Sequence, residues 1–239
     1  MNGIPNEAAQ TEDFEFAALS EAKNYRHALL AEYSGHLRGT VLEVGAGIGQ
    51  LTGLLLKNDA IGKLVSIEPD ARFCARLRQA FPSHTLVQGT ILNAPEERWD
   101  AILNINVLEH IPDDRLELER YRRLLAPAGG TLCLFVPARP EIYAPIDRDF
   151  GHFRRYTRAG LRARLQQAGF EVLKLRYYNI AGYFAWWLNF RLLRRRHFSS
   201  EAVRIFDRLI FPPVHGIERA LCPPPVGQSL LAVARAKHD

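Results

Sequence analysis

The chain has 239 residues, of which 47% are hydrophobic and 24% charged, so it can form one large domain with a substantial core. Its three cysteines are far apart, which argues against a zinc site or a disulfide framework and favours a reducing compartment. The net charge is +5, and no secretory signal or stretch of about 18 apolar residues is evident, so we expect a cytoplasmic protein.

The hydrophobic pattern predicts strands that alternate with helices, after an N-terminal arm over residues 1–20. Helices are expected at 21–37, 49–59, 71–81, 114–125 and 158–170, the last ending near Gly169. Strands are expected at 40–47, 63–70, 85–90, 99–108, 131–137, 171–179 and 228–236.

This alternation predicts βαβ units in an α/β domain with a mostly parallel sheet. The first five strands are almost wholly apolar, as strands covered on both faces must be. The last strand follows a long insertion, so it can pair antiparallel. We therefore divide a single domain into a core at 38–175, a helical insertion at 177–226 and a last strand at 228–237.

A glycine-rich loop follows the first strand, with Gly45, Gly47 and Gly49 ahead of the next helix. Glycines there let the backbone turn tightly and approach a ligand closely. The dinucleotide fingerprint would need a third glycine at position 50 or 52, where the chain has Gln50 and Thr52. The pattern therefore disfavours a nicotinamide cofactor.

An acid, Glu68, ends the second strand and precedes Pro69. A carboxylate at this point can accept hydrogen bonds from both hydroxyls of a ribose. Alone it would more often be a surface residue or a helix cap. Its spacing of about 20 residues from the glycine loop favours a nucleoside site.

Five segments in this order resemble the class I S-adenosylmethionine-dependent methyltransferases. They are "LEVGAGIGQLT", "SIEPD", "QGTILN", "DAILNINVLEHIPD" and "LLAPAGGTLCLFVP". The resemblance implies a Rossmann-like, doubly wound sheet of seven strands with an antiparallel last strand.

The resemblance also implies S-adenosylmethionine as cofactor and a set of contacts to it. These are Glu43, Gly45, Gly47 and Gly49 for the methionine moiety, Glu68 and Pro69 for the ribose, Gln88, Gly89, Thr90 and Ile91 for adenine, and Asn106 and Val107 near the sulfonium. Many relatives carry an acid where this chain has Thr90, which can accept the adenine bond through its hydroxyl or leave it to the backbone.

Methyl transfer requires alignment of the reactants and, for a hydroxyl acceptor, benefits from a general base such as histidine. His110 follows the fourth strand in "LEH", which many relatives share, so a structural role is an alternative. His152 follows the fifth strand in "DFGHFRRYT", where loops face the ligand crevice. We predict His152 as base or orienter of the acceptor.

Tyr143, Arg154, Arg155 and Tyr156 are predicted to contact the substrate, because they belong to the same region. The alternative is that the arginines cap the following helix or pair with Asp147 and Asp149. "GHFRRYT" is similar to a subset of bacterial methyltransferases associated with glycans, lipids or secondary metabolites.

The insertion "YYNIAGYFAWWLNFRLLRRRHF" combines aromatic residues with the arginines Arg191 and Arg194 to Arg196. The segment from Arg176 to Arg219 has eight arginines and three acids, an excess equal to the net charge of the chain. It can form a lid over the acceptor, a homodimer face, a peripheral membrane contact or a solvated helix.

These features predict a methyltransferase that acts on a small-molecule or lipid- or glycan-linked acceptor, with oxygen favoured as the atom that is methylated. The alternative is a non-catalytic partner protein that binds S-adenosylmethionine. We expect no nucleic-acid partner, because recognition modules are lacking and "NINV" replaces the motif of amino-directed DNA methylases. We expect no metal, because no clustered Asp/Asn set is evident.

Overall fold

A computed structural model describes residues 20–127, 129–195, 199–220 and 224–237 of this chain. The arm predicted at residues 1–20 therefore lies outside the described residues except for residue 20, as do Arg196 and Cys222.

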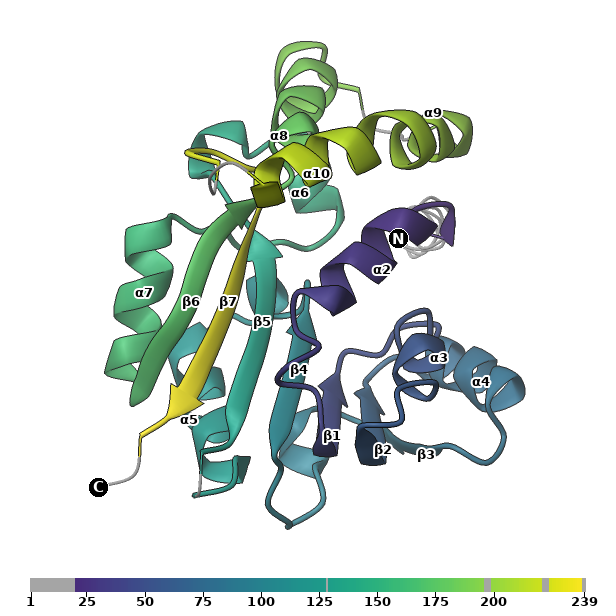
Figure 1. Ribbon diagram of the computed structural model, residues 1–239, viewed down its shortest axis with the longest axis vertical. Coiled ribbons are helices and arrows are strands. Elements are labelled where there is room, and N and C mark those ends of the chain that lie inside the picture. Colours follow the sequence, from purple (N-terminus) through teal and green to yellow (C-terminus); the bar gives the residue numbers. More distant parts are fainter. Residues whose placement is uncertain (1–19, 128, 196–198, 221–223, 238–239) are drawn as a thin grey trace, which may run out of the picture.

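A single twisted sheet forms the centre of the molecule (Figure 1). Its strands are β1 (Gly39–Val44), β2 (Ile61–Glu68), β3 (Thr85–Gln88), β4 (Ala101–Ile105), β5 (Thr131–Pro137), β6 (Phe170–Tyr178) and β7 (Ser229–Ala236). Their order is β3-β2-β1-β4-β5-β7-β6, with β7 antiparallel to both neighbours and the first five strands parallel. The predicted seven-stranded sheet with an antiparallel last strand is confirmed.

Helices cover both faces of this sheet. They are α2 (Lys23–Ala31), α3 (Thr52–Leu55), α4 (Ala71–Ala80), α5 (Asp114–Leu124), α6 (Pro145–Asp149), α7 (Arg158–Gln167), α8 (Ile180–Trp186), α9 (Ser200–Ile205) and α10 (Phe211–Ala220). One apolar core joins α5 and α7 to the sheet, and a second joins α2, α3 and α10 to its other face. This two-sided cover explains why β1, β2, β4 and β5 are so apolar, whereas the edge strand β3 has no buried residue.

Side-chain caps and a left-handed glycine fix several helix ends. Asp70 accepts a bond from Arg72 N at 2.7 Å before α4, and Thr157 accepts one from Gly160 N at 3.0 Å before α7. Gly169, with φ of +86°, follows α7 in the left-handed conformation that ends many helices.

The helix predicted at 49–59 is much shorter than expected. It covers only Thr52–Leu55, because Gly49 adopts a φ of +83° and so cannot belong to a right-handed helix. The helix predicted at 21–37 is likewise shorter, at Lys23–Ala31.

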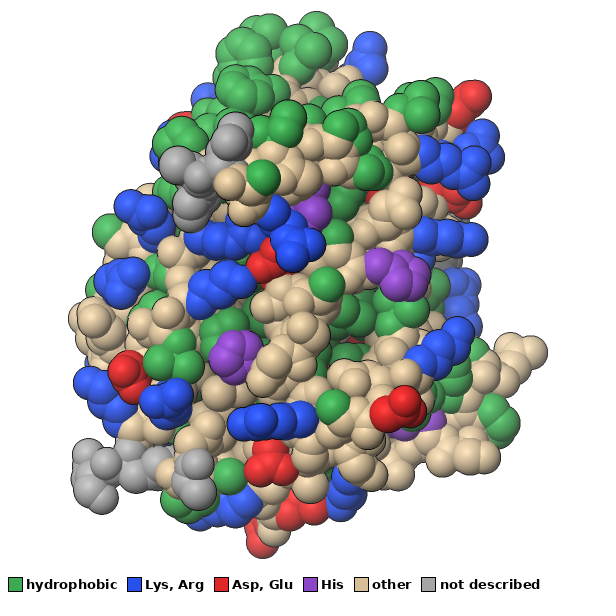
Figure 2. Space-filling view, viewed as in Figure 1, with side chains coloured by type: hydrophobic (Ala, Val, Ile, Leu, Met, Phe, Trp, Pro, Cys, Tyr) green, Lys and Arg blue, Asp and Glu red, His purple; other side chains and the backbone are tan. Residues whose placement is uncertain are grey.

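The insertion folds into a helical cap above the edge where the parallel strands end (Figure 1). It comprises α8, α9 and α10 with π-helical turns at Trp187–Leu192 and Phe206–Ile210. A third apolar cluster joins it to the α6 region through Trp186 and Phe190. Hydrophobic side chains also gather on its outer side (Figure 2). Among the described residues, no helix has the length and apolar character needed to cross a membrane.

Candidate active site

The glycine loop lies between β1 and α3 and is held by close packing as well as by conformation. Gly45, Gly47 and Gly49 have φ values of +77°, +55° and +83°, which strongly favour glycine. A Cβ atom at Gly45 would lie 2.2 Å from Cγ2 of Val107, which follows β4. The loop therefore packs directly against a second segment of the predicted cofactor site.

Glu68 connects this loop to the end of β2. Its Oε2 accepts a hydrogen bond from Gly47 N at 2.8 Å, and its Oε1 accepts one from Asp70 N at 2.9 Å. The side chain is buried. The carboxylate predicted to hold the ribose thus lies against the glycine loop, as a nucleoside site requires.

Glu43 lies below the loop with almost no exposure. Its Oε2 accepts bonds from Thr52 Oγ1 at 2.7 Å and Ser66 Oγ at 2.6 Å, whereas its buried Oε1 has no hydrogen-bond partner. Burial raises the pKa of Glu43 to about 7, although the two hydroxyl donors oppose this shift. An unsatisfied buried carboxylate oxygen here fits a ligand with a cationic amino group, such as the methionine moiety.

The pH dependence of stability should report on Glu43. Because its pKa is raised in the folded state, the folded chain retains a proton that the unfolded chain releases above its ordinary pKa of 4.5. The free energy of unfolding should therefore fall between about pH 4.5 and pH 7, by at most about 1.4 kcal/mol per pH unit. Urea unfolding at several pH values measures this contribution, and Glu43→Gln should remove it. An unchanged pH dependence in that variant would contradict the assignment.

The segments predicted to flank adenine and the sulfonium follow β3 and β4. Gly89 N donates to Glu68 O at 3.0 Å, and Ile91 is buried. Thr90 caps the short helix at Ile91–Asn93, its Oγ1 accepting from Leu92 N at 3.4 Å. Asn106 has a φ of +53°, and its N donates to Phe135 O at 2.8 Å. The contact of Thr90 with adenine stays a prediction. Its hydroxyl oxygen already accepts the hydrogen bond from Leu92 N.

A cavity of about 580 Å³ lies between this edge of the sheet and the helical cap. Asn106, Glu109, His152 and Arg155 line it on the sheet side, and α2 contributes Tyr25. The cap side is mostly apolar and includes Trp186, Phe190, Ile205, Phe206 and Ile210. Because Asn106 belongs to both the cavity and the predicted cofactor set, the cavity adjoins the cofactor region.

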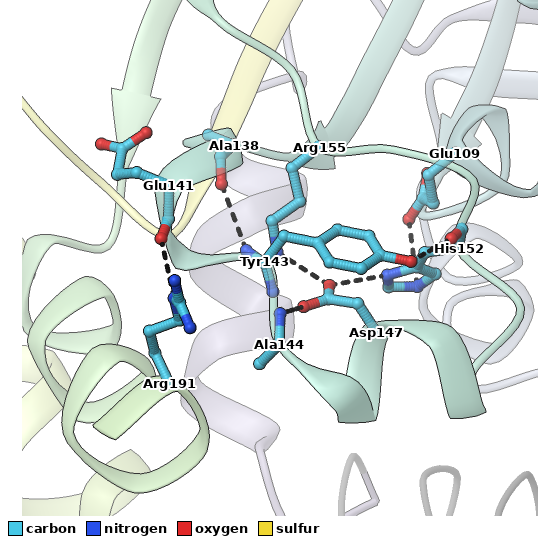
Figure 3. Close-up of polar contacts among 9 residues, drawn as sticks. All are labelled: Glu109, Ala138, Glu141, Tyr143, Ala144, Asp147, His152, Arg155 and Arg191. Carbon is cyan, nitrogen blue, oxygen red and sulfur yellow. Dashed lines mark hydrogen bonds and ion pairs between the residues drawn. The ribbon is translucent and has the colours of Figure 1, made fainter. Parts of the chain in front are cut away.

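His152 is held in one orientation at this cavity (Figure 3). Its Nδ1 lies 3.0 Å from Oδ1 of the buried Asp147, and its Nε2 lies 3.9 Å from Oε1 of Glu109. A carboxylate can only accept, so Nδ1 donates its proton to Asp147. When the ring is neutral, Nε2 is then its proton acceptor. Tyr143 OH donates to the backbone oxygen of His152 at 2.8 Å.

Asp147 is a candidate functional residue that the sequence analysis considered only as a partner of the arginines. It accepts bonds from Ala144 N at 2.9 Å and from Nε of Arg155 at 2.7 Å, in addition to His152. Arg155 also donates to Ala138 O at 3.1 Å (Figure 3). Its guanidinium lies over the Trp186 ring, 4.3 Å from the ring centroid. Of the four predicted substrate residues, Arg155 lines the cavity, and it does so while paired with Asp147.

Arg154 and Tyr156 point to a different carboxylate, that of Asp114 on α5. Arg154 Nη1 lies 2.9 Å from Asp114 Oδ2, and Tyr156 OH donates to the same oxygen at 2.9 Å. These contacts anchor the loop to α5. The substrate roles predicted for both residues stay predictions, and their geometry favours an anchoring role.

His110 lies beside His152, with ring centroids 4.7 Å apart. Burial lowers the pKa of His110 to about 4, and the neighbouring His152 adds to this shift. Within the described residues, Glu109, His110 and His152 offer ligand atoms within 4.8 Å of one another, a set that could hold a metal ion. Sequence spacing did not indicate this set, because His152 comes from a separate loop.

Comparisons with known proteins agree with this geometry. Residues 16–175 match the family described as "Methyltransferase domain". A probable S-adenosylmethionine-dependent methyltransferase of Mycolicibacterium smegmatis is 27% identical over 180 residues, which are 72% of this chain and 68% of that protein.

Two solved structures are similar in fold. The complex of DhpI with S-adenosylhomocysteine has a TM-score of 0.61 at 18% identity, covering 98% of this chain and 94% of that one. The N-methyltransferase NodS of Bradyrhizobium japonicum, also with S-adenosylhomocysteine, has a TM-score of 0.54 at 17% identity, with 88% of each chain covered. With the family match over most of the core, the sheet order and the glycine loop against Glu68, this chain belongs to the class I S-adenosylmethionine-dependent methyltransferases.

Proposed function

We propose that this enzyme methylates a hydroxyl group on an apolar, lipid-like or lipid-linked acceptor. The observation that supports this proposal is a histidine, fixed by Asp147, that lines a mostly apolar cavity. A cavity of about 580 Å³ is in the usual range for a small-molecule site and accommodates a substantial apolar group.

The cofactor residues would hold S-adenosylmethionine, which supplies the methyl group. Glu43, with its unsatisfied buried oxygen, and the glycine loop suit the methionine moiety, and Glu68 suits the ribose. Nε2 of His152 accepts the proton of the acceptor hydroxyl as the oxygen becomes a nucleophile. The imidazolium that forms is stabilised by Asp147 at 3.0 Å and Glu109 at 3.9 Å. The apolar walls exclude water and orient the acceptor.

A panel of matched acceptors tests the proposal. Long-chain phenols and alcohols are incubated with the purified protein and S-adenosylmethionine, beside the amines and acids of the same skeletons, and methylated products are measured by mass spectrometry. We expect products from hydroxyl compounds, and more from long chains than from short ones. Products from amines alone would contradict oxygen as the acceptor atom. Cofactor binding without any product would favour the non-catalytic alternative.

Glu68→Ala should weaken S-adenosylmethionine binding by on the order of 1–3 kcal/mol, the scale of a lost charge-assisted hydrogen bond. The substitution also removes the acceptor of Gly47 N, so the loop loses support. Titration calorimetry measures the affinity. Glu97→Ala is the control, because Glu97 forms an exposed ion pair with Lys63. Wild-type affinity in a folded Glu68→Ala protein would remove Glu68 from the cofactor site.

A further inference from the structure

Most of the exposed large hydrophobic side chains in the described part of the chain belong to the helical cap. Nine of the fourteen exposed large hydrophobic residues in the described part of the chain lie between Phe184 and Ile217. Leu209 is 69% exposed, Phe184 and Ile217 are 57% exposed, and Leu192 is 56% exposed. We call the exposed side chains of residues 184–195 and 199–219 the cap face, which lies uppermost in Figure 2. A concentration of this kind marks an interaction surface.

The cap face is also strongly basic, because two of the three acids in this segment are buried and accept hydrogen bonds from backbone N–H groups. Asp207 is buried and accepts from Asn24 N and Tyr25 N at 2.9 and 2.8 Å. Glu218 is buried and accepts from Ile180 N at 2.6 Å. Among the described residues of this face, Glu201 is the exposed acid, against the exposed arginines Arg191, Arg194, Arg195, Arg204, Arg208 and Arg219.

The first cap helices are apolar on two sides. Trp186 and Phe190 are buried and line the cavity, whereas the adjacent Trp187 and Leu188 are 44% and 45% exposed. A helix that is apolar all round normally has both sides covered. The inner side is covered by the α6 region, so the outer side is the one left to a partner.

The cap face is continuous with the cavity. Ile205 and Ile210 line the cavity and are also 46% and 44% exposed on the cap face. Arg195 likewise lines the cavity and is exposed on the cap face. A partner that covers the cap face would therefore lie at the entrance to the predicted acceptor site.

Charge decides between the two partners that could cover this face. A second copy in a two-fold dimer would place the face against itself, with arginines opposite arginines. An anionic bilayer surface accepts bulky apolar side chains at the level of the headgroups and attracts the arginines. We propose that the cap face docks peripherally on an anionic lipid bilayer, with the cavity opening toward the lipid.

Cosedimentation of the full chain with lipid vesicles tests this proposal without requiring catalysis. We expect binding to vesicles that combine phosphatidylcholine with phosphatidylglycerol, and little binding to phosphatidylcholine alone. Raising the ionic strength from about 0.1 M to 1 M should weaken binding, because the Debye length falls from about 10 Å to 3 Å. Recovery in the supernatant with anionic vesicles at low salt would overturn the proposal.

Two pairs of charge reversals locate the surface. Arg204→Glu/Arg208→Glu on the cap face should lower the vesicle partition coefficient by about tenfold or more. The matched control is Arg78→Glu/Arg162→Glu, at exposed positions on α4 and α7, with the same change in net charge. Equal losses in both variants would show attraction to overall charge and overturn the cap face as the docking surface.

A substitution of the apolar part provides an independent measurement. Trp187→Ser/Leu188→Ser should reduce binding to anionic vesicles even at low salt, with the fold verified by circular dichroism. Size-exclusion chromatography with light scattering on the same proteins detects a dimer. A wild-type dimer that dissociates on this substitution, together with no vesicle binding, would assign the cap face to a second copy instead.

Discussion

His152→Ala is expected to lower methyl-transfer turnover by about 10²–10⁴-fold, the usual contribution of a general base, while S-adenosylmethionine affinity stays nearly unchanged. The reason is that His152 lines the cavity predicted to hold the acceptor, and its Nδ1 bond to Asp147 makes Nε2 of the neutral ring the proton acceptor. A smaller loss, seen mainly in the Michaelis constant of the acceptor, would indicate that His152 orients the acceptor instead.

Steady-state kinetics over a range of pH, with calorimetry for the cofactor, measure this effect. His27→Asn is the control, because it changes an exposed histidine on α2, whereas His110 lies directly beside His152. A wild-type rate and pH profile in His152→Ala would contradict the role of His152 as the base.

The same assay tests the expectation that no metal takes part. We expect activity to be unaffected by a chelator. Loss of activity on chelation, with recovery on adding one divalent ion, would reassign Glu109, His110 and His152 as ligands, since their donor atoms lie within 4.8 Å.

The central strands of the sheet were predictable from the sequence because they are buried on both faces. A strand such as Thr131–Pro137 is buried at every position. Its apolar run is too short for a buried helix, so the sequence indicates a strand. The long insertion showed only that the last strand could pair antiparallel, and the resemblance to the methyltransferases predicted that it does. The helix at 49–59 was overextended, because periodicity does not report the left-handed φ of Gly49.

The acceptor side of the site was less predictable, because tertiary contacts create it. Asp147 meets His152 and Arg155 only because α6 turns the chain back on itself, and neither spacing nor composition indicates that turn. Arg154 and Tyr156 contact Asp114, which is distant in the sequence. The sequence of the insertion was compatible with a lid, a dimer face, a membrane contact or a solvated helix. In the folded protein its inner side lines the cavity and its outer side is exposed.

Asp147→Ala is expected to lower the free energy of unfolding by about 3–5 kcal/mol, the cost of breaking a buried ion pair by removing one partner. The Arg155 side chain is 1% exposed and that of Asp147 is 0% exposed, so water cannot replace the lost carboxylate easily. Burial already lowers the pKa of Arg155, and Asp147 opposes that shift. Ala144 N and His152 Nδ1 lose their acceptor as well.

Urea unfolding of Asp147→Ala and of Glu119→Ala compares this buried pair with an exposed one. Glu119 pairs with Arg115 at 3.0 Å, but the Arg115 side chain is 68% exposed, so we expect a loss below about 0.5 kcal/mol. The double variant Asp147→Leu/Arg155→Met removes both charges and should recover much of the loss, because the uncompensated guanidinium is then absent. If the double variant is as unstable as Asp147→Ala, the lost bonds to Ala144 and His152 dominate, and the uncompensated charge of Arg155 does not.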